Sequence, residues 1–347
     1  MGITSILLAI LVLSIVIIVH EFGHFLLAKK NGIGVTEFTL GLGPKIVGFT
    51  RKDTLYCIKA IPFGGSCVMV GEDDEDASEK SFNSKSPWAR LSVLVAGPIF
   101  NFLLAFVLAV VVIGFVGIDK PVLTDVIEGY PAEEAGMQGG DVITQINDKK
   151  IVIYRDVTLY LMEHSGETLE VTYTRDGQEH KTTIVPKYNE ESGSYMMGIQ
   201  VQGGREQVSP LDTLKYSVYE VKFLASSTIS GLKQLVTGKV ARTDISGAVG
   251  IVNHVGEMVE ETKSAGAFTV FINLTNISIM ISMSLGVCNL LPIPALDGGR
   301  ILFIIIELIR GKPVAKEKEG MVHAIGMAFM MVLLVVVLFN DIINILN

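Results

Sequence analysis

The sequence predicts a polytopic α-helical membrane protein with about four transmembrane helices, a membrane-associated β-hairpin or sheet, and an inserted α/β domain. Of its 347 residues, 49% are hydrophobic and 18% are charged, which is too apolar for an ordinary soluble enzyme. Long uncharged runs recur, and the first extends from Ile3 to Val19. The net charge of −8 comes from residues 119–206, where sixteen acidic residues face eight basic ones. This acidic segment therefore has the composition of a separate soluble domain.

The first predicted transmembrane helix, residues 1–30, contains the motif His20-Glu21-Phe22-Gly23-His24. Histidines at positions i and i+4 lie on one helix face and can take two positions of a tetrahedral zinc ion. The glutamate between them then lies beside the metal, where it can act as a general base toward water. Ionisable groups in hydrocarbon are costly to bury unpaired, which favours a functional role over an accidental one.

Other site types find no support in the composition. The three cysteines are scattered and suggest neither a disulfide framework nor a cysteine zinc site. No basic stripe indicates nucleic-acid binding. The cysteines are Cys57, Cys67 and Cys288.

Residues 31–86 predict a β region associated with the cytoplasmic side of the membrane. Short β-prone runs between residues 34 and 70 are separated by glycines and prolines. An exposed strand edge there can pair with an extended peptide, and the alternative is an interfacial loop with no substrate role. The acidic run Glu72–Glu79 predicts a solvated loop.

The rest of the chain alternates between apolar and polar segments. The second helix contains Asn101, a polar residue that needs a partner in the membrane. Beyond the acidic domain, Leu211–Val236 predicts an interfacial amphipathic helix and residues 246–251 a packed turn. His323 has no partner pattern and is taken as structural. The predicted boundaries are 87–117 for the second transmembrane helix, 118–206 for the inserted domain, 207–266 for the linker, 267–311 for the third helix and 320–343 for the fourth.

Basic residues predict the orientation of these segments. They cluster after the first apolar run and between the third and fourth, and the positive-inside rule assigns such loops to the cytoplasm. Both termini and the domain 118–206 are therefore expected to be extracytoplasmic.

A catalytic zinc site needs a third protein ligand and an open position for water. The best candidate is Asp297, in the Pro- and Gly-rich stretch Asn289–Gly299 that interrupts the third apolar segment. Broken backbone at membrane depth is tolerated where it lines protein or a water-filled cavity. Glu307 is the rival ligand, on an unbroken run nearer the cytoplasmic end.

Two resemblances carry these observations further. Residues 131–136 (PAEEAG) and 139–148 (GGDVITQIND) resemble a PDZ domain of the bacterial protease-associated kind. HEFGH together with NLLPIPALDGG, supported by AGPIFN, IPFGG and SGAVGI, resembles the site-2 protease family of intramembrane zinc metalloproteases in its bacterial RseP/RasP form. This second resemblance covers nearly the whole chain, which has one PDZ segment where some relatives have two.

The resemblance implies a zinc metalloendopeptidase that cleaves transmembrane segments of single-span proteins in regulated intramembrane proteolysis. It implies that His20, His24 and Asp297 bind Zn²⁺ and that Glu21 is the catalytic acid/base. The sheet over residues 34–70 is expected to clamp an unwound substrate segment. Substrate contacts are expected from Asn289, Gly64, Gly65 and Asn101.

The expected partners are the bilayer and single-span membrane proteins trimmed beforehand by another protease, with no nucleic acid. Anti-sigma factors, remnant signal peptides and peptide precursors all fit as substrates. The PDZ domain either binds peptides by strand addition or acts as a steric cap. A non-catalytic PDZ-bearing scaffold or chaperone is the alternative function, but it predicts loss of Glu21 or of a ligand. A transporter usually shows paired repeats, and the sequence shows none.

Overall fold

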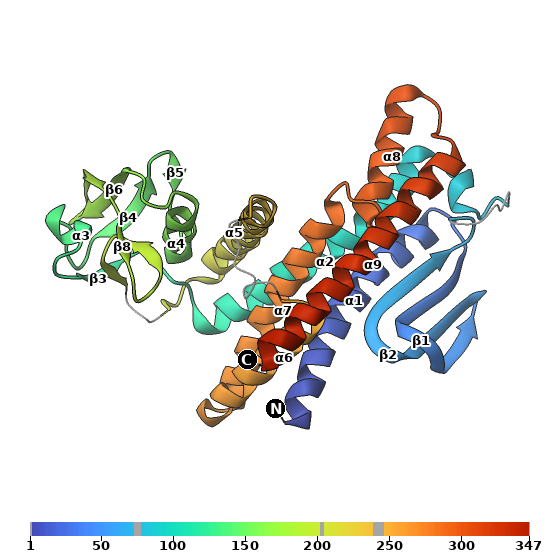
Figure 1. The fold of residues 1–347 in the computed structure, drawn as a ribbon, viewed down its shortest axis with the longest axis horizontal. Helices are drawn as coiled ribbons and strands as arrows, with labels where there is room; N and C mark the ends of the chain where they lie inside the picture. The colour runs from blue at the N-terminus through green and yellow to red at the C-terminus, as the bar shows by residue number, and fades with distance from the viewer. Residues whose placement is uncertain (1, 73–77, 202–204, 239–245, 347) are drawn as a thin grey trace. The chain divides into compact units, whose positions relative to one another are not determined.

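The computed structural model describes residues 2–72, 78–201, 205–238 and 246–346 (Figure 1). The chain forms two compact units, one from residues 1–108 and 231–347 and the other from residues 109–230. The first unit contains most of the apolar sequence, and the second contains the acidic insertion.

Four helices of the described chain are long and apolar enough to cross a membrane. A helix suits this environment because it pairs its backbone groups internally, and about 20 residues span the hydrocarbon. Many of their large apolar side chains remain exposed, as lipid contact requires. The chain is therefore a polytopic helical membrane protein, as predicted. The four helices are α1 (Ile3–Lys30), α2 (Pro87–Val116), α7 (Ala267–Leu290) and α9 (Lys316–Leu346).

Glycines bring α2 unusually close to α1. A Cβ atom added at Gly23 would lie 2.5 Å from the carbonyl oxygen of Ala96, and one added at Gly97 would lie 2.3 Å from Nε2 of His24. Any larger residue would push the helices apart. The sequence AGPIFN thus holds α2 directly against the histidine face of α1.

The β region is a single antiparallel hairpin of two long strands, β1 (Val35–Arg51) and β2 (Thr54–Met69). The expectation of several short strands was wrong about their length, because the irregularities shift the register and bend the strands without ending them. Residues 37–40 pair with 65–68 and also with 55–58, so the hairpin curls back on itself. Among the described residues, 65–69 pairs only with 35–40 and forms an edge of this sheet.

One apolar cluster joins the C-terminal end of α1 to the hairpin, to α2 and to the helix α8 (Asp297–Arg310). Its burial holds the hairpin and α8 in fixed positions around the end of α1 that carries the histidines. Its buried members are Ala28, Ile33, Val35, Cys67, Met69, Phe82, Val93, Leu94 and Ile304.

The Pro- and Gly-rich stretch separates α7 from α8. α7 ends at Leu290, and residues 291–296 form a tight loop in which the Leu296 N–H donates to the Ile293 carbonyl at 3.2 Å. α8 then begins at Asp297. The loop therefore places Asp297 in the interior of the unit formed by residues 1–108 and 231–347.

Residues 246–251 were predicted as a packed turn, and this prediction was wrong. They lead into a helix, α6 (Ala248–Thr262). The buried carboxylate of Asp341 on α9 accepts hydrogen bonds from the backbone N–H groups of Gly247 at 2.8 Å and Gly250 at 2.9 Å. A carboxylate at a helix N-terminus accepts hydrogen bonds from free N–H groups and interacts favourably with the positive end of the helix dipole. These two effects explain why this stretch becomes helical.

The unit of residues 109–230 contains the predicted α/β domain, together with the end of α2 and most of α5. Its main sheet has the strand order β5-β4-β6-β7, β3 pairs with β10, and β8 pairs with β9. The predicted Asp176–Gly177 hairpin turn is confirmed between β6 and β7. These strands and the helices α3 and α4 enclose one apolar core. The elements are β3 (Leu123–Val126), α3 (Pro131–Glu134), β4 (Val142–Ile146), β5 (Lys149–Lys150), α4 (Tyr154–Glu163), β6 (Leu169–Arg175), β7 (Gln178–Ile184), β8 (Lys187–Asn189), β9 (Ser194–Met196) and β10 (Ile199–Val201), followed by α5 (Pro210–Val236).

Candidate active site

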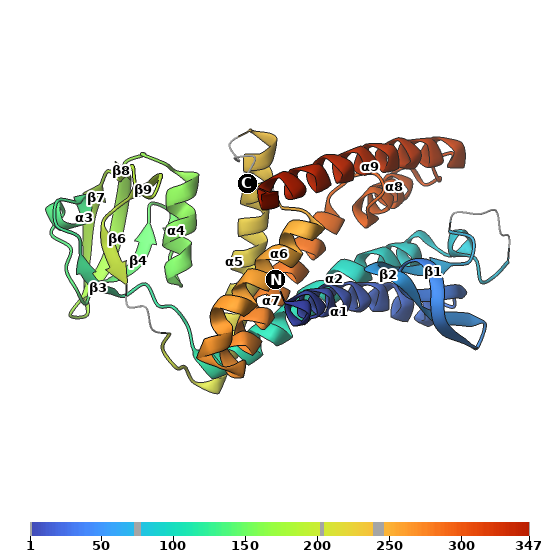
Figure 2. The same cartoon turned by 60° about the horizontal axis from the view of Figure 1, so that its bottom comes forward.

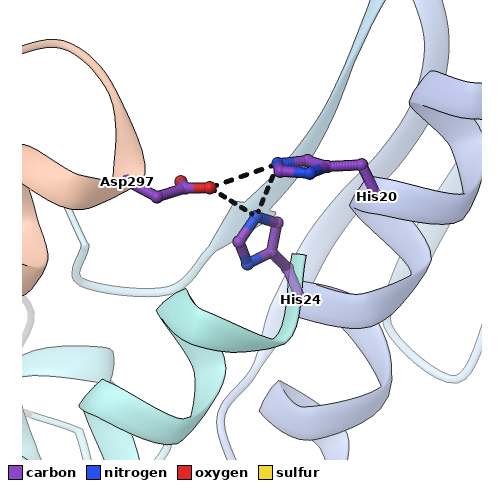
Figure 3. A group of neighbouring side chains, drawn as sticks. All are labelled: His20, His24 and Asp297. Atoms are coloured by element: carbon purple, nitrogen blue, oxygen red, sulfur yellow. Dashed lines mark hydrogen bonds and ion pairs between the residues drawn. The ribbon is translucent and has the colours of Figure 1, made fainter. Parts of the chain in front are cut away.

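Two histidines of α1 and the first residue of α8 converge on one point (Figure 3). The Nε2 atoms of His20 and His24 lie 3.2 Å apart. Oδ2 of Asp297 lies 3.2 Å from Nε2 of His20 and 3.3 Å from Nε2 of His24. Both histidines are buried, and the Asp297 side chain is 19% exposed.

These three atoms fit the coordination sphere of zinc. Tetrahedral zinc binds nitrogen and oxygen at about 2.0–2.1 Å, so neighbouring ligand atoms lie about 3.3 Å apart. The separations of 3.2 and 3.3 Å match that spacing. Oδ2 of Asp297 is also buried and makes no hydrogen bond within the described residues, which is costly for a carboxylate without a cation. Three protein ligands leave a fourth position for water or substrate.

α2 sets the orientation of both imidazole rings. Nδ1 of His24 donates to the backbone carbonyl of Val93 at 2.9 Å, which leaves the lone pair of Nε2 free for a metal. Nδ1 of His20 lies 3.1 Å from the side-chain amide of Asn101. Asn101 was expected to contact substrate, but the structure instead places its amide against His20.

A cavity of about 650 Å³ opens beside the three ligands and is lined by them and by Glu21. Of the other residues predicted to contact substrate, Gly64, Gly65 and Asn289 line it as well. A Cβ added at Gly65 would lie 3.2 Å from Cγ of Glu21, so the sheet edge passes directly over the glutamate. Asn101 is fully buried and does not line this cavity.

The rival ligand Glu307 has a different partner. Its carboxylate pairs with Arg90 of α2 at 2.6 Å, and the side chains are 14% and 12% exposed, respectively. The structure therefore brings Asp297 to the histidines and uses Glu307 in a buried ion pair.

The sequence analysis missed one ion pair in the cavity wall. Arg300 pairs with Glu72 at 2.5 Å, and both residues line the cavity. Arg300 lies three residues after Asp297, a spacing that places both on one helix face and was available as a signal. Glu72 begins the acidic run that was expected to be a solvated loop, of which residues 73–77 lie outside the described chain.

The profile of Peptidase family M50 matches residues 8–333, which include all three converging ligands. The chain belongs to peptidase family M50. A relative from Clostridium acetobutylicum is 36% identical over 347 residues and covers 100% of both chains. Zinc metalloprotease RasP of Oceanobacillus iheyensis is 32% identical over 427 residues, covering 98% of this chain and 99% of that protein. Regulator of sigma-W protease RasP of Bacillus subtilis is 29% identical over 425 residues and covers 99% of each.

Two solved PDZ domains also align with part of this M50 protein. They belong to SdrC-like proteins of Listeria monocytogenes and Listeria innocua, each with 22% identity and a TM-score of 0.22. They cover 24% and 26% of this chain and 88% and 100% of their own chains. The PDZ domain was expected from residues 131–136 and 139–148, and residues 109–230 contain the strands, helices and apolar core of a small α/β domain.

The predicted resemblance to the site-2 protease family in its RasP form is confirmed. This M50 protein is a zinc metalloprotease of the membrane, with zinc as its metal.

Proposed function

We propose that this M50 protease cleaves the transmembrane segments of single-span membrane proteins, with His20, His24 and Asp297 as zinc ligands and Glu21 as the catalytic acid/base. One observation carries the proposal. Three metal-type donors at tetrahedral spacing and a glutamate line a single cavity, and the histidines and the glutamate lie on a helix apolar enough to cross a membrane.

The residues of the cavity supply the steps of peptide hydrolysis. Zinc, when bound, acts as a Lewis acid that polarises the scissile carbonyl. Glu21 accepts a proton from the attacking water and returns it to the leaving amine. The amide of Asn289, at the end of α7 and in the cavity wall, donates a hydrogen bond to the developing oxyanion.

The substrate must unwind before it can be cut, because a helix encloses each peptide bond in its i→i−4 hydrogen bonds. The sheet edge 65–69 offers replacement hydrogen bonds to an extended segment beside Glu21. Gly64 and Gly65 add no side chain to this wall, which leaves room for the substrate backbone.

The substrates are single-span proteins already trimmed by another protease. Anti-sigma factors, remnant signal peptides and peptide precursors have the required form. The Bacillus subtilis relative is named a regulator of sigma-W protease, which supports the first of these classes. The acidic PDZ domain then acts mainly as a size filter, since its charge disfavours peptide carboxylates.

The PDZ domain and both termini are extracytoplasmic. Basic residues after α1 and between α8 and α9 support this orientation. The native cysteines are buried or half-buried, so their background labelling is low. A cysteine that replaces Gln178 should react with an impermeant thiol reagent added outside the cell, and a cysteine that replaces Lys312 should not. The reverse pattern would place the PDZ domain in the cytoplasm.

The test of the chemistry is Glu21→Gln, assayed with purified protein and a panel of single-span substrates, with zinc present or chelated. We expect cleavage to fall by about 10² to 10⁴, because the amide cannot accept the proton. Zinc content should stay at the wild-type level. The matched control is Glu261→Gln, which changes an exposed glutamate of α6 and should leave cleavage unchanged.

Near-normal turnover in Glu21→Gln would exclude Glu21 as the acid/base. A wild-type protein that binds zinc but cleaves no substrate of the panel, and only retains partners through its PDZ domain, would favour the scaffold function.

A further inference from the structure

The loop that carries Asp297 holds one residue in an unfavourable backbone conformation. Ala295, two residues before Asp297, has φ = +76°. L-residues rarely adopt this left-handed region, because Cβ approaches the following carbonyl oxygen. Such a conformation persists only where neighbouring structure holds it in place. The position of Asp297 therefore depends on contacts from outside the loop.

A histidine of α9 supplies one of these contacts. Nδ1 of His323 accepts a hydrogen bond from the backbone N–H of Ala295 at 3.2 Å. The His323 ring also lies 5.6 Å from that of Phe303 on α8 at a tilt of 51°. The imidazole thus contacts both the loop and the helix that begins with Asp297.

The next turn of α9 fits against the same loop. A Cβ added at Gly326 would lie 2.2 Å from Cβ of Pro294 and 2.9 Å from its carbonyl oxygen. Gly326 is buried, whereas most of the neighbouring residues of α9 are exposed. α9 runs beside α8 in both views (Figure 2), and its Met327 reaches the cavity wall.

We infer that His323 is a positioning residue for the metal centre. With Gly326, it holds residues 294–295 in the conformation that presents the Asp297 carboxylate to zinc. The inference rests on the proposed ligand role of Asp297 and goes beyond it, because it makes the fourth membrane helix part of the site. The sequence alone had suggested only a structural histidine.

The test measures zinc affinity of the purified full-length protein by competition with a chromogenic chelator. His323→Ala should weaken zinc binding about 10- to 100-fold, the usual effect of removing an outer partner of a metal ligand. His323→Asn should keep affinity near the wild type, because Oδ1 of asparagine occupies the place of Nδ1. His254→Ala removes an exposed histidine of α6 as a control.

Rescue separates positioning from general packing. Glycine adopts φ > 0 without penalty, so it needs no outside support at position 295. Ala295→Gly should therefore restore zinc affinity when combined with His323→Ala. If His323 only contributed to packing, Ala295→Gly would not restore the zinc affinity of His323→Ala.

The glycine pair of α9 gives an independent test that does not require removal of the histidine. Gly326→Ala should lower zinc affinity, because the new methyl group collides with Pro294. Gly320→Ala is its matched control on the same helix, where an added Cβ meets nothing within 4 Å. Both variants are to be checked for folding by thermal unfolding in detergent.

Wild-type affinity in both His323→Ala and Gly326→Ala would overturn the inference. Failure of Ala295→Gly to rescue, or a loss in His323→Asn as large as in His323→Ala, would overturn it as well. Zinc binding by Asp297→Ala, measured alongside, distinguishes a failure of the ligand assignment from a failure of the positioning role. If that variant keeps its zinc, the ligand assignment itself fails; if it loses zinc while the His323 and Gly326 variants keep theirs, only the positioning role fails.

Discussion

The side-chain amide of Asn101 on α2 lies 3.1 Å from Nδ1 of His20 on α1, and both residues are buried. The amide oxygen of Asn101 has no hydrogen-bond partner among the described residues. A metal on Nε2 requires the proton of His20 to sit on Nδ1, which then needs an acceptor. Flipping the side-chain amide of Asn101 places its oxygen beside Nδ1 of His20, where it can accept this hydrogen bond. α2 thus offers a partner for each histidine.

Asn101→Ala should lower zinc affinity about 10-fold, because Nδ1 of His20 loses its partner and the ring is free to turn. Asn101→Asp supplies an acceptor and should bind zinc more tightly than the alanine variant. Chelator competition measures both. Asn253→Ala, which removes a half-buried asparagine of α6 that donates to Glu257, serves as the control. Equal affinities in wild type and Asn101→Ala would exclude an orienting role.

Replacing each of the two candidate third ligands should have different effects on bound zinc and on the stability of the fold. Asp297→Ala should lose most bound zinc, because it removes a ligand. Glu307→Ala should keep its zinc and lower stability by about 3–5 kcal/mol, because Arg90 is left buried without its partner. Metal analysis measures the zinc that each variant retains, and thermal unfolding measures its stability. Zinc loss confined to Glu307→Ala would restore Glu307 as the ligand.

The PDZ domain should lose stability in acid through Asp141. Burial alone would raise the pKa of the Asp141 carboxyl, but hydrogen bonds from Arg175 and from the Gln138 N–H outweigh it, and the pKa lies below its ordinary value. The two bonds from Arg175 are 2.7 and 2.8 Å long. A lowered pKa stabilises the folded state above the unfolded value of about 3.9, and this contribution disappears as pH falls through the folded value.

Resistance of residues 109–230 to pepsin, measured in the full-length protein from about pH 5 to about pH 2, should therefore fall below about pH 4. Asp141→Asn should be less resistant at the upper end of this range and show a flatter pH dependence, since the titrating group is gone. An equally steep dependence in the variant would assign the acid response to other carboxyl groups.

The PDZ domain can be excised at a place where the chain already closes on itself. Ile118 and Glu206 exchange backbone hydrogen bonds of 3.0 and 2.9 Å, so their backbones are adjacent. Replacing residues 119–205 with a short Gly/Ser linker should allow cleavage of untrimmed single-span substrates, if the domain excludes bulky ones. Cleavage of trimmed substrates is the control. Its loss in a protein that remains folded and zinc-loaded would indicate that the domain recruits substrate.

The sequence by itself determined the parts of this protein that depend on local spacing and composition. A helix repeats every 3.6 residues, so His20 and His24 had to share a face with Glu21 beside them. Uninterrupted apolar runs longer than a bilayer requires predicted the spanning helices, and Asp176–Gly177 predicted its turn. The prolines and glycines around Asp297 marked the broken segment.

Only the tertiary structure decided which distant groups meet. The broken stretch favoured Asp297 over Glu307, but only the fold brings Asp297 to the histidines and pairs Glu307 with Arg90. The partners of Asn101 and His323 likewise come from other helices. The same holds for residues 246–251, where a carboxylate 91 residues away caps the helix. Such contacts depend on how helices pack in three dimensions, and neither periodicity nor composition contains that information.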